Sequence, residues 1–427
     1  MSRINDSMIR EDLVTYSESE DSSANGSGQK RILIYSHDTF GLGHLQRCLK
    51  ICRALVDRDS DISILLVTGS PWAHRYRFPE RVDYLKMPAV RKVGTNQYVP
   101  RSLKTSFDRV YALRKDLLLQ SVQTFDPHLL LVDHAPVGMR GELLPALQWH
   151  RQHRPQAVRV LGLRDIVDEP AYVIDHWKRN GIYEIMDRMY ERIAIYGSRA
   201  IFDLVAAYQI PPELHSRIEY CNYVSNYEVD TSEEVESKNE RPLIVVSIGG
   251  GDGAAEEVIG NYLDMVEQYA STLQADSIVV TGPFISSDLL RQYHSRCDNL
   301  PVEVRRFVSN LSSYMRRSDL IVSTGGYNTV TESIGYGRRA LLIPRVVYRE
   351  EQLMRARRFA ELGLVKFIHP KDVTARLLFD MVSEMLDDQS CPLTEARRIG
   401  RIPLDGAHRI AALCCDAMAE QLVRQTR

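Results

Sequence analysis

The stretch STGGYNTVTESIGYGRRALLIPRVVYREEQ, residues 323–352, decides how the C-terminal half of the chain folds. An apolar run ends at the glycine pair Gly325–Gly326, and the pattern then predicts a helix that Asn328 or Thr329 caps and that carries Glu332. Backbone N–H groups of a glycine pair can approach an anion closely, and a helix N-terminus adds partial positive charge. Glu332, one turn into the helix, is placed to reach a ribose hydroxyl. The stretch therefore predicts a site for a nucleoside diphosphate.

Three acidic or amide side chains of this stretch have both a binding and a structural interpretation. Thr329 and Glu332 have the spacing of a capping box, in which the glutamate bonds back to the N-cap amide. Glu351 and Gln352 follow the loop after Pro344, where they are placed either to contact hydroxyls of a second ligand moiety or to begin a solvated helix. The residues alone leave these alternatives open.

A second glycine-rich turn, SIGGGDGA at 247–254, follows the apolar run 243–247 and opens a helix. Glycines remove side chains where the backbone must meet a ligand. This turn alone is a weak signal, but together with Gly325–Gly326 it predicts two loops that converge on one diphosphate. Its candidate ligand-binding residues are Gly249, Gly250, Gly251 and Gly253.

Short apolar runs alternate with helical periods along most of the chain. We predict buried parallel strands at 32–35, 62–67, 129–133, 158–163, 243–247, 277–281, 320–323 and 340–343. The helix after the first strand keeps one face apolar, through Leu45, Cys48, Cys52 and Leu55. Strands that alternate with helices are typical of doubly wound α/β domains. The predicted fold class is α/β, with two doubly wound Rossmann-like domains facing each other across a cleft.

Changes in composition divide the chain into four parts. Residues 1–29 are polar and acidic, which predicts a disordered tail. An acidic stretch at 230–240 reads as a linker, so we place the N-terminal domain at 30–235 and the C-terminal domain at 236–404. An amphipathic C-terminal helix follows at 405–427, free to pack back on the N-terminal domain.

Bulk composition excludes several classes of protein. The net charge of −2 gives no reason to expect a nucleic acid partner. Seven cysteines without metal-ligand spacing favour a reducing cytoplasm. No run of about 18 apolar residues and no signal peptide are present, so a spanning helix is not expected. Peripheral contact with the inner face of a membrane stays open.

The first strand leads into YSHDTFGLGH, residues 35–44, which places two histidines and an acid at the carboxyl edge of the sheet. Ligands of open α/β sheets bind at this edge. His44, at the first helical turn, is a candidate base because the unperturbed pKa of histidine lies near neutrality. His37 and Asp38 share the loop and are further catalytic candidates. The alternative is a histidine that only hydrogen-bonds the turn.

Asp133 ends the strand LLLVD and should lie at the same sheet edge. It is placed to orient His44 or His37 and to stabilise an imidazolium; the alternative is an aspartate that caps the next turn. Glu142 is a weaker candidate carboxylate. No segment has the residues and spacing of a metal site, and His150-x-x-His153 lacks further ligands.

The run at 91–104 is basic and loop-like. It predicts either a solvated loop or a surface for an anionic acceptor or a membrane.

The chain resembles the GT-B glycosyltransferases of family 28 over most of residues 31–425. The glycine pair of 323–352 and the turn that ends in Gly43-His44 carry the resemblance. The first loop departs from the family at Ser36-His37-Asp38, and segments such as 163–168 resemble a MurG-like subgroup distinct from the peptidoglycan enzyme itself. The resemblance implies that Glu332 holds the ribose and that His44 has the active-site role. It also implies that Gly325, Gly326 and Asn328 lie along the diphosphate. The backbone near Val308 would then contact the nucleotide base, and Gln352 would contact the sugar.

The resulting hypothesis is an inverting, metal-independent glycosyltransferase. It would move a hexose or N-acetylhexosamine from a nucleotide sugar, UDP-linked in our prediction, to an acceptor hydroxyl. The C-terminal domain would bind the donor, and the N-terminal domain would bind a glycan, lipid-linked or small-molecule acceptor near Gly41, Gly43 and Glu142. No cofactor is expected. The alternatives are a GT-B-fold UDP-sugar 2-epimerase and a non-catalytic nucleotide-sugar-binding partner.

Overall fold

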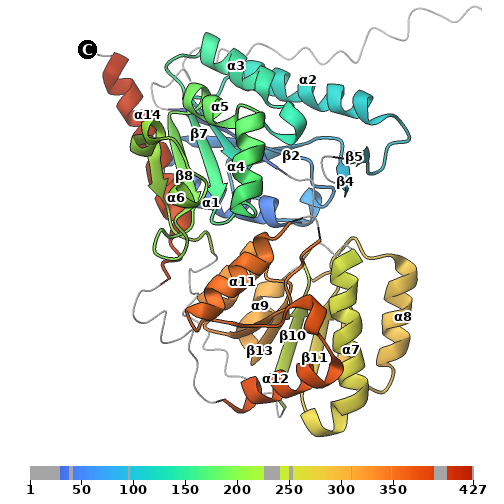
Figure 1. The fold of residues 1–427 in the computed structure, drawn as a ribbon. Coiled ribbons are helices and arrows are strands. Elements are labelled where there is room, and N and C mark those ends of the chain that lie inside the picture. Colours follow the sequence, from blue (N-terminus) through green and yellow to red (C-terminus); the bar gives the residue numbers. More distant parts are fainter. Residues whose placement is uncertain are drawn as a thin grey trace, which may run out of the picture.

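The computed structural model describes residues 29–37, 42–94, 97–225, 241–249, 253–308, 310–347, 349–388 and 402–425. Within them the chain forms two α/β domains, each built on one parallel sheet (Figure 1). The predicted tail, apart from Gln29, and the predicted linker lie outside the described residues.

The N-terminal domain is built on seven parallel strands in the order β3-β2-β1-β6-β7-β8-β9. The strands are β1 (Lys30–Ser36), β2 (Ile62–Thr68), β3 (Val82–Lys86), β6 (Leu129–Asp133), β7 (Val158–Arg164), β8 (Arg192–Tyr196) and β9 (Ile218–Tyr220). The α-helices are α1 (Gly43–Arg58), α2 (Phe107–Phe125), α3 (Leu144–His153), α4 (Pro170–Arg179), α5 (Ile182–Met189) and α6 (Leu204–Ala207). Short 3-10 helices are η1 (Ala73–Arg75), η2 (Met139–Gly141) and η3 (Pro212–Arg217).

The C-terminal domain is built on six parallel strands in the order β12-β11-β10-β13-β14-β15. The strands are β10 (Leu243–Ser247), β11 (Asp276–Val280), β12 (Val302–Arg305), β13 (Leu320–Ser323), β14 (Arg339–Leu342) and β15 (Lys366–Phe367). The helices of this domain are α7 (Gly253–Leu273), α8 (Ser287–Cys297), α9 (Leu311–Arg317), α10 (Tyr327–Gly335), α11 (Glu351–Glu361), η4 (Pro370–Asp372) and α12 (Ala375–Asp387), and helix α14 (Gly406–Gln425) follows it.

The central strand β1 explains why the N-terminal sheet is covered on both faces. Its side chains alternate between two cores: Ile32 and Ile34 pack with α1, whereas Leu33 and Tyr35 pack with α2 and α3. All four are fully buried. A strand that is apolar on both faces belongs inside a parallel sheet with helices on either side. The predicted α/β class with two Rossmann-like domains is confirmed, and the strands β3, β8, β9, β12 and β15 were not foreseen.

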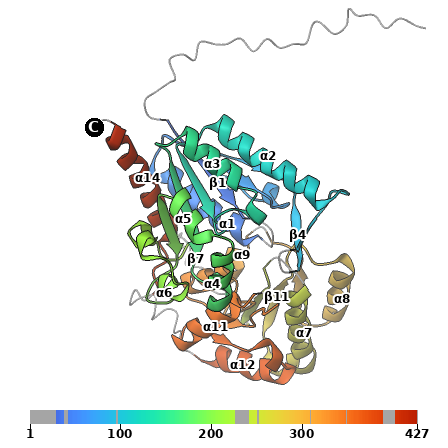
Figure 2. The same ribbon diagram turned by 45° about the horizontal axis from the view of Figure 1, so that its top comes forward.

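Helix α14 lies against α1 of the N-terminal domain, although it follows the C-terminal domain in sequence (Figures 1 and 2). Its first turn is tied down by an isolated bridge between Val224 and Asp405, and Arg192 forms an ion pair with Glu420. Ile410 and Cys414 are fully buried in the core that also holds β1. The chain therefore crosses between the domains twice.

The basic run at 91–104 contains most of an antiparallel hairpin, formed by β4 (Val90–Gly94) and β5 (Gln97–Pro100), where we had expected a loop. The hairpin lies at the end of the N-terminal domain that faces the C-terminal domain (Figure 2). Just beyond it, the guanidinium of Arg101 stacks over the ring of Phe284, 4.1 Å from its centroid. Among the described helices, none has the length and apolar character needed to cross a membrane.

Candidate active site

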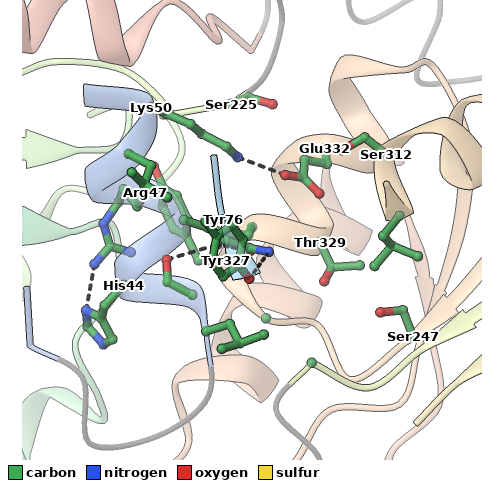
Figure 3. A pocket seen from close by; sticks show the side chains of 18 of the residues that line it. His44, Arg47, Lys50, Tyr76, Ser225, Ser247, Ser312, Tyr327, Thr329 and Glu332 are labelled. Carbon is green, nitrogen blue, oxygen red and sulfur yellow. Dashed lines mark hydrogen bonds and ion pairs between the residues drawn. The ribbon is translucent and has the colours of Figure 1, made fainter. Parts of the chain in front are cut away.

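A cavity of about 710 Å³ lies between the two domains, and both contribute to its wall (Figure 3). The predicted site residues that line it are His37, Gly43, His44, Gly249, Val308, Gly326, Asn328, Glu332, Glu351 and Gln352. Asp133, Gly325 and Glu142 lie behind the wall rather than in it, and Gly253 begins α7. Four predicted residues, Asp38, Gly41, Gly250 and Gly251, lie outside the described residues.

His44 and Asp133 form a buried pair at the carboxyl edge of the N-terminal sheet. His44 lies in the first turn of α1 and Asp133 ends β6, so both reach the same edge because β1 and β6 are parallel neighbours. Nδ1 of His44 is 2.5 Å from Oδ2 of Asp133. A carboxylate accepts and cannot donate, so we assign the ring proton to Nδ1. Nε2 then carries the free lone pair.

The electrostatics of this pair keep the imidazole neutral and the aspartate charged. Burial lowers the pKa of His44 more than the charge and hydrogen bond of Asp133 raise it. Burial alone would raise the pKa of Asp133, yet Arg47 and His44 lower it to about 2. A neutral imidazole beside a fixed carboxylate is the form that can accept a proton from a hydroxyl.

Arg47 completes the arrangement, and the sequence interpretation missed it. Its Nη2 and Nε atoms donate to Oδ1 of Asp133 at 2.7 and 2.9 Å, and its side chain is buried. The guanidinium lies 5.3 Å from the ring centroids of both Tyr196 and Tyr327. Its spacing was a usable signal, because residues three apart on a helix share a face and Arg47 follows His44 at that interval.

Two further histidines stand beside His44. Ring centroids of His37 and His134 lie 5.7 and 5.3 Å from that of His44, and we call these three residues the histidine cluster. Burial is the main reason that the pKa values of His37 and His134 are well below the usual range, with nearby positive charge adding to it. His134 was not foreseen, although it directly follows Asp133 and so had to lie at the same sheet edge.

Glu142 does not face the cleft, contrary to its prediction as an acceptor-side carboxylate. It is fully buried, and both its oxygens accept hydrogen bonds from Arg114 at 2.6 and 2.7 Å. Tyr35 also donates to Glu142 at 2.8 Å, and the same hydroxyl lies 3.3 Å from Nδ1 of His37. A buried carboxylate requires a cationic partner, and Arg114 is that partner. Through Tyr35, Glu142 therefore supports the floor beneath the histidine cluster.

Glu332 lies in the cleft wall and forms an ion pair across it. Its Oε1 is 2.8 Å from Nζ of Lys50 on α1, a pair that Figure 3 shows spanning the two domains. The capping-box interpretation is wrong, because α10 begins at Tyr327 and Thr329 is already inside the helix. Lys50 was missed, since nothing local to either residue announces a contact between positions 282 residues apart.

The glycine pair and Asn328 prepare the N-terminus of α10. Gly325 has φ +76°, a conformation that favours glycine, and Gly326 is the N-cap residue without a side-chain bond. Asn328 is not the cap but the second helical residue. Its amide donates to the carbonyl of Gly43 at 3.0 Å and to Gln46 at 3.1 Å. The free N–H groups of this helix therefore open beside the first turn of α1.

Glu351 and Gln352 begin α11, and both side chains already have partners. Arg164 of the N-terminal domain lies 2.7 Å from Glu351, and Arg355 lies 3.6 Å from it. Burial alone would raise the pKa of Glu351, yet these arginines lower it to about 2. Gln352 accepts a hydrogen bond from the backbone of Arg345 at 3.1 Å. The alternative interpretation, a solvated helix start, is wrong, because Glu351 and Gln352 are only 6% and 8% exposed.

Comparison with known families bears on the C-terminal half. Residues 245–409 match the family described as the glycosyltransferase family 28 C-terminal domain. A similar curated protein is the UDP-N-acetylglucosamine--N-acetylmuramyl-(pentapeptide) pyrophosphoryl-undecaprenol N-acetylglucosamine transferase of Finegoldia magna, 29% identical over 147 residues. That match spans 34% of this chain and 39% of the relative, so it covers well under half of either protein.

Solved structures extend the likeness to both domains. The glycotransferase of kitacinnamycin has a TM-score of 0.62 at 17% identity, covering 91% of this chain and 99% of that one. MurG of Acinetobacter baumannii has a TM-score of 0.57 at 12% identity, with the same coverage. A putative UDP-N-acetylglucosamine 2-epimerase from Listeria monocytogenes has a TM-score of 0.61 at 11% identity, covering 92% and 97%. The predicted GT-B fold and the MurG-like resemblance are confirmed.

The C-terminal domain is held to the N-terminal domain by the segment that follows β7. Asp165 receives two hydrogen bonds from Arg355, at 2.8 and 2.9 Å, and both side chains are buried. Asp168 accepts the backbone N–H of Glu350 at 2.8 Å. In the sequence this segment only marked a subgroup; in the structure it fixes the start of α11 against the cleft.

Among the described residues, no group of three or more His, Cys, Asp or Glu side chains is arranged to hold a metal ion. Metal independence stays a prediction.

Removing one partner of the Asp165–Arg355 pair should destabilise the protein strongly. Asp165→Ala takes two hydrogen bonds and the nearest carboxylate away from the buried Arg355, so we expect a loss of about 3–5 kcal/mol in the free energy of unfolding, measured by urea titration. Replacing both residues, Asp165→Leu with Arg355→Met, should recover most of it. As a control, Glu361→Ala removes an exposed pair with Arg358 and should cost less than about 1 kcal/mol. Equal losses for Asp165→Ala and Glu361→Ala would contradict this account.

Proposed function

We propose that the protein is an inverting, metal-independent glycosyltransferase that moves a hexose or N-acetylhexosamine from a UDP-sugar to an acceptor hydroxyl. One observation carries the proposal: the His44–Asp133 pair of the N-terminal domain faces the glycine turn and Glu332 of a family 28 domain across one cavity. The N-terminal domain then supplies the catalytic base, and the C-terminal domain supplies the donor site. A cleft of this kind can exclude water from the transfer step.

The donor would lie along the C-terminal domain. The diphosphate would face the N-terminus of α10, where Gly326 and the turn at Gly249 expose backbone N–H groups. Glu332 would accept hydrogen bonds from the ribose hydroxyls, and the backbone at Val308 would contact the base. The cavity wall also carries Arg47 and Arg164, so the leaving diphosphate would meet positive charge without a metal ion.

Transfer would proceed by one displacement at the anomeric carbon. The acceptor oxygen forms the new bond to that carbon while the bond to the diphosphate oxygen breaks, and UDP leaves with the electron pair. Nε2 of His44 takes the hydroxyl proton, and Asp133 stabilises the imidazolium that results. Attack opposite the leaving group inverts the anomeric configuration.

An epimerase remains the second candidate, since the Listeria monocytogenes structure shares this fold. Incubation with UDP-N-acetylglucosamine alone separates the two activities, because an epimerase changes the sugar without an acceptor. A non-catalytic partner would bind UDP but need no base.

The acceptor side is proposed only by class: a glycan, a lipid-linked sugar or a small molecule. For a lipid-linked acceptor we propose a cytoplasmic protein with peripheral membrane contact near the β4–β5 hairpin. Val93 and Leu103 are 42% and 52% exposed there, beside the basic residues Arg91 and Lys104.

A thermal-shift panel tests the donor site directly. UDP at ~100 times its Kd should stabilise the protein by about 2.7 kcal/mol, and EDTA should not change the shift. We expect UDP to exceed GDP and ADP, with dTDP as the near relative. If no nucleotide raises the melting temperature, the glycine turns are structural and the proposed function fails.

His44→Ala should lower kcat by about 10²–10⁴-fold and leave the thermal shift with UDP unchanged. The pKa of His44 lies below the usual value, and only the neutral ring is a base. In the wild type, kcat/KM should therefore be level at pH 7 and fall as the pH drops through that pKa, below 6.5. His153→Ala, at an exposed histidine of α3, is the control. Turnover retained in His44→Ala would refute the assignment of the base.

Glu332→Ala should raise the Kd for UDP by about 10–100-fold, because hydrogen bonds to a charged group contribute about 1.5–3 kcal/mol. Lys50→Met is the matched control, since it breaks the same ion pair but keeps the carboxylate. Isothermal titration with UDP should find Lys50→Met close to the wild type. Equal weakening in both variants would show that Glu332 acts only through the ion pair.

A further inference from the structure

Lys92 is a cation in the cleft wall without a counter-ion. It lies on β4, lines the cavity and is partly buried. Its ammonium group makes no hydrogen bond or ion pair with any residue in the described part of the chain. A partly buried ammonium without a partner loses hydration and gains nothing in return, unless a ligand supplies the charge.

Two arginines of the family 28 domain converge on Lys92. Arg345 and Arg349, from the loop between β14 and α11, line the same cavity. Burial, together with the charges of Arg349 and Arg345, lowers the pKa of Lys92 to about 8, although Asp168 opposes this. Asp168 is a poor counter-ion for the group, because it lies 4.0 Å from Arg349 and already accepts two backbone hydrogen bonds.

The three cations line the same cavity as Gly326 and the histidine cluster. A Cβ atom on Gly325 would lie 3.7 Å from the carbonyl oxygen of Gln352, and the side chain of Gln352 accepts the backbone N–H of Arg345. At the other end, the charge of Arg349 contributes to the low pKa values of His37 and His134. A sugar that lies between the diphosphate and the catalytic base His44 would have to pass these cations.

Among the described residues that line the cavity, the loop between β14 and α11 presents cations to this sugar and no free carboxylate. Glu351 is the acidic residue placed to accept sugar hydroxyls, but Arg164 and Arg355 hold it and it is 6% exposed. Sugar hydroxyls can accept hydrogen bonds from lysine or arginine, but a neutral hydroxyl does not balance the positive charge of these side chains. A carboxylate matches these donors in charge and geometry.

We propose that Lys92, Arg345 and Arg349 bind the carboxylate of the transferred sugar, so that the donor is a UDP-linked hexuronic acid. The inference rests on the proposed function and specifies its donor. The site is separate from the one for the diphosphate. An anionic group on the acceptor would present the same chemistry, so the experiment distinguishes the two sources.

Isothermal titration of the full-length protein with UDP, UDP-glucose and UDP-glucuronate tests this inference. UDP-glucuronate should bind at least about tenfold more tightly than UDP-glucose, the factor expected from one charge-assisted contact. Lys92→Met should abolish most of this preference and leave the affinity for UDP unchanged. Arg91→Met is the matched control. The side chain of Arg91 is exposed and points to the face of the strand opposite to that of Lys92, so this substitution should leave the preference for UDP-glucuronate intact. Arg349→Met should reproduce the effect of Lys92→Met.

The outcomes separate this inference from the proposed function. Failure to bind UDP would overturn the proposed function itself. Normal UDP binding with equal affinity for the two sugars would overturn only the acidic donor. Inorganic phosphate is the probe for the second source: if it stabilises the complex with UDP-glucose, and Lys92→Met removes that effect while the two donors bind equally, the anion belongs to the acceptor and the proposal is wrong. Wild-type melting temperatures for the variants exclude misfolding as the cause.

Discussion

The buried ion pair between Asp165 and Arg355 is the contact on which the cleft depends. Both side chains are buried, so neither charge can be left without the other. Arg355 also donates to the carbonyl of Gly325 at 3.2 Å, which ties the pair to the glycine turn. One guanidinium thus sets the position of the donor-side turn against the strand end that carries Arg164 and Asp165.

The same electrostatic logic organises the histidine cluster. A buried aspartate beside His44 would by itself favour the imidazolium, but Arg47 neutralises much of its charge. Burial then keeps the ring neutral. The N-terminal domain therefore presents a base in its useful state, while the opposite wall presents N–H groups and cations. The two halves of the proposed chemistry meet only because the domains are fixed relative to each other.

Reasoning from the sequence succeeded where local pattern and sheet geometry decide the result. Buried runs predicted the central strands, and the parallel arrangement predicted that Asp133 and His44 meet, because parallel strands end at one edge. It did not foresee the distant cationic partners of three carboxylates. Glu142 is held by Arg114, Glu332 by Lys50 and Glu351 by Arg164, and each had been assigned from its neighbours in the chain. Short edge strands with mixed polarity, such as β3 and β15, lacked a pattern to detect.

The sequence by itself determined the α/β class, the two glycine turns and the sheet edge at which His44 and Asp133 stand. Periodicity and backbone requirements act over a few residues, so they can be recognised in the amino-acid sequence. Only the tertiary structure decided which carboxylates stay open to a ligand and which cations stay unpaired. Lys50 and Glu332 are 282 positions apart, and Asp165 and Arg355 are 190 apart. Coulomb attraction depends on distance in space and on burial, and both are set only when the two domains close on each other.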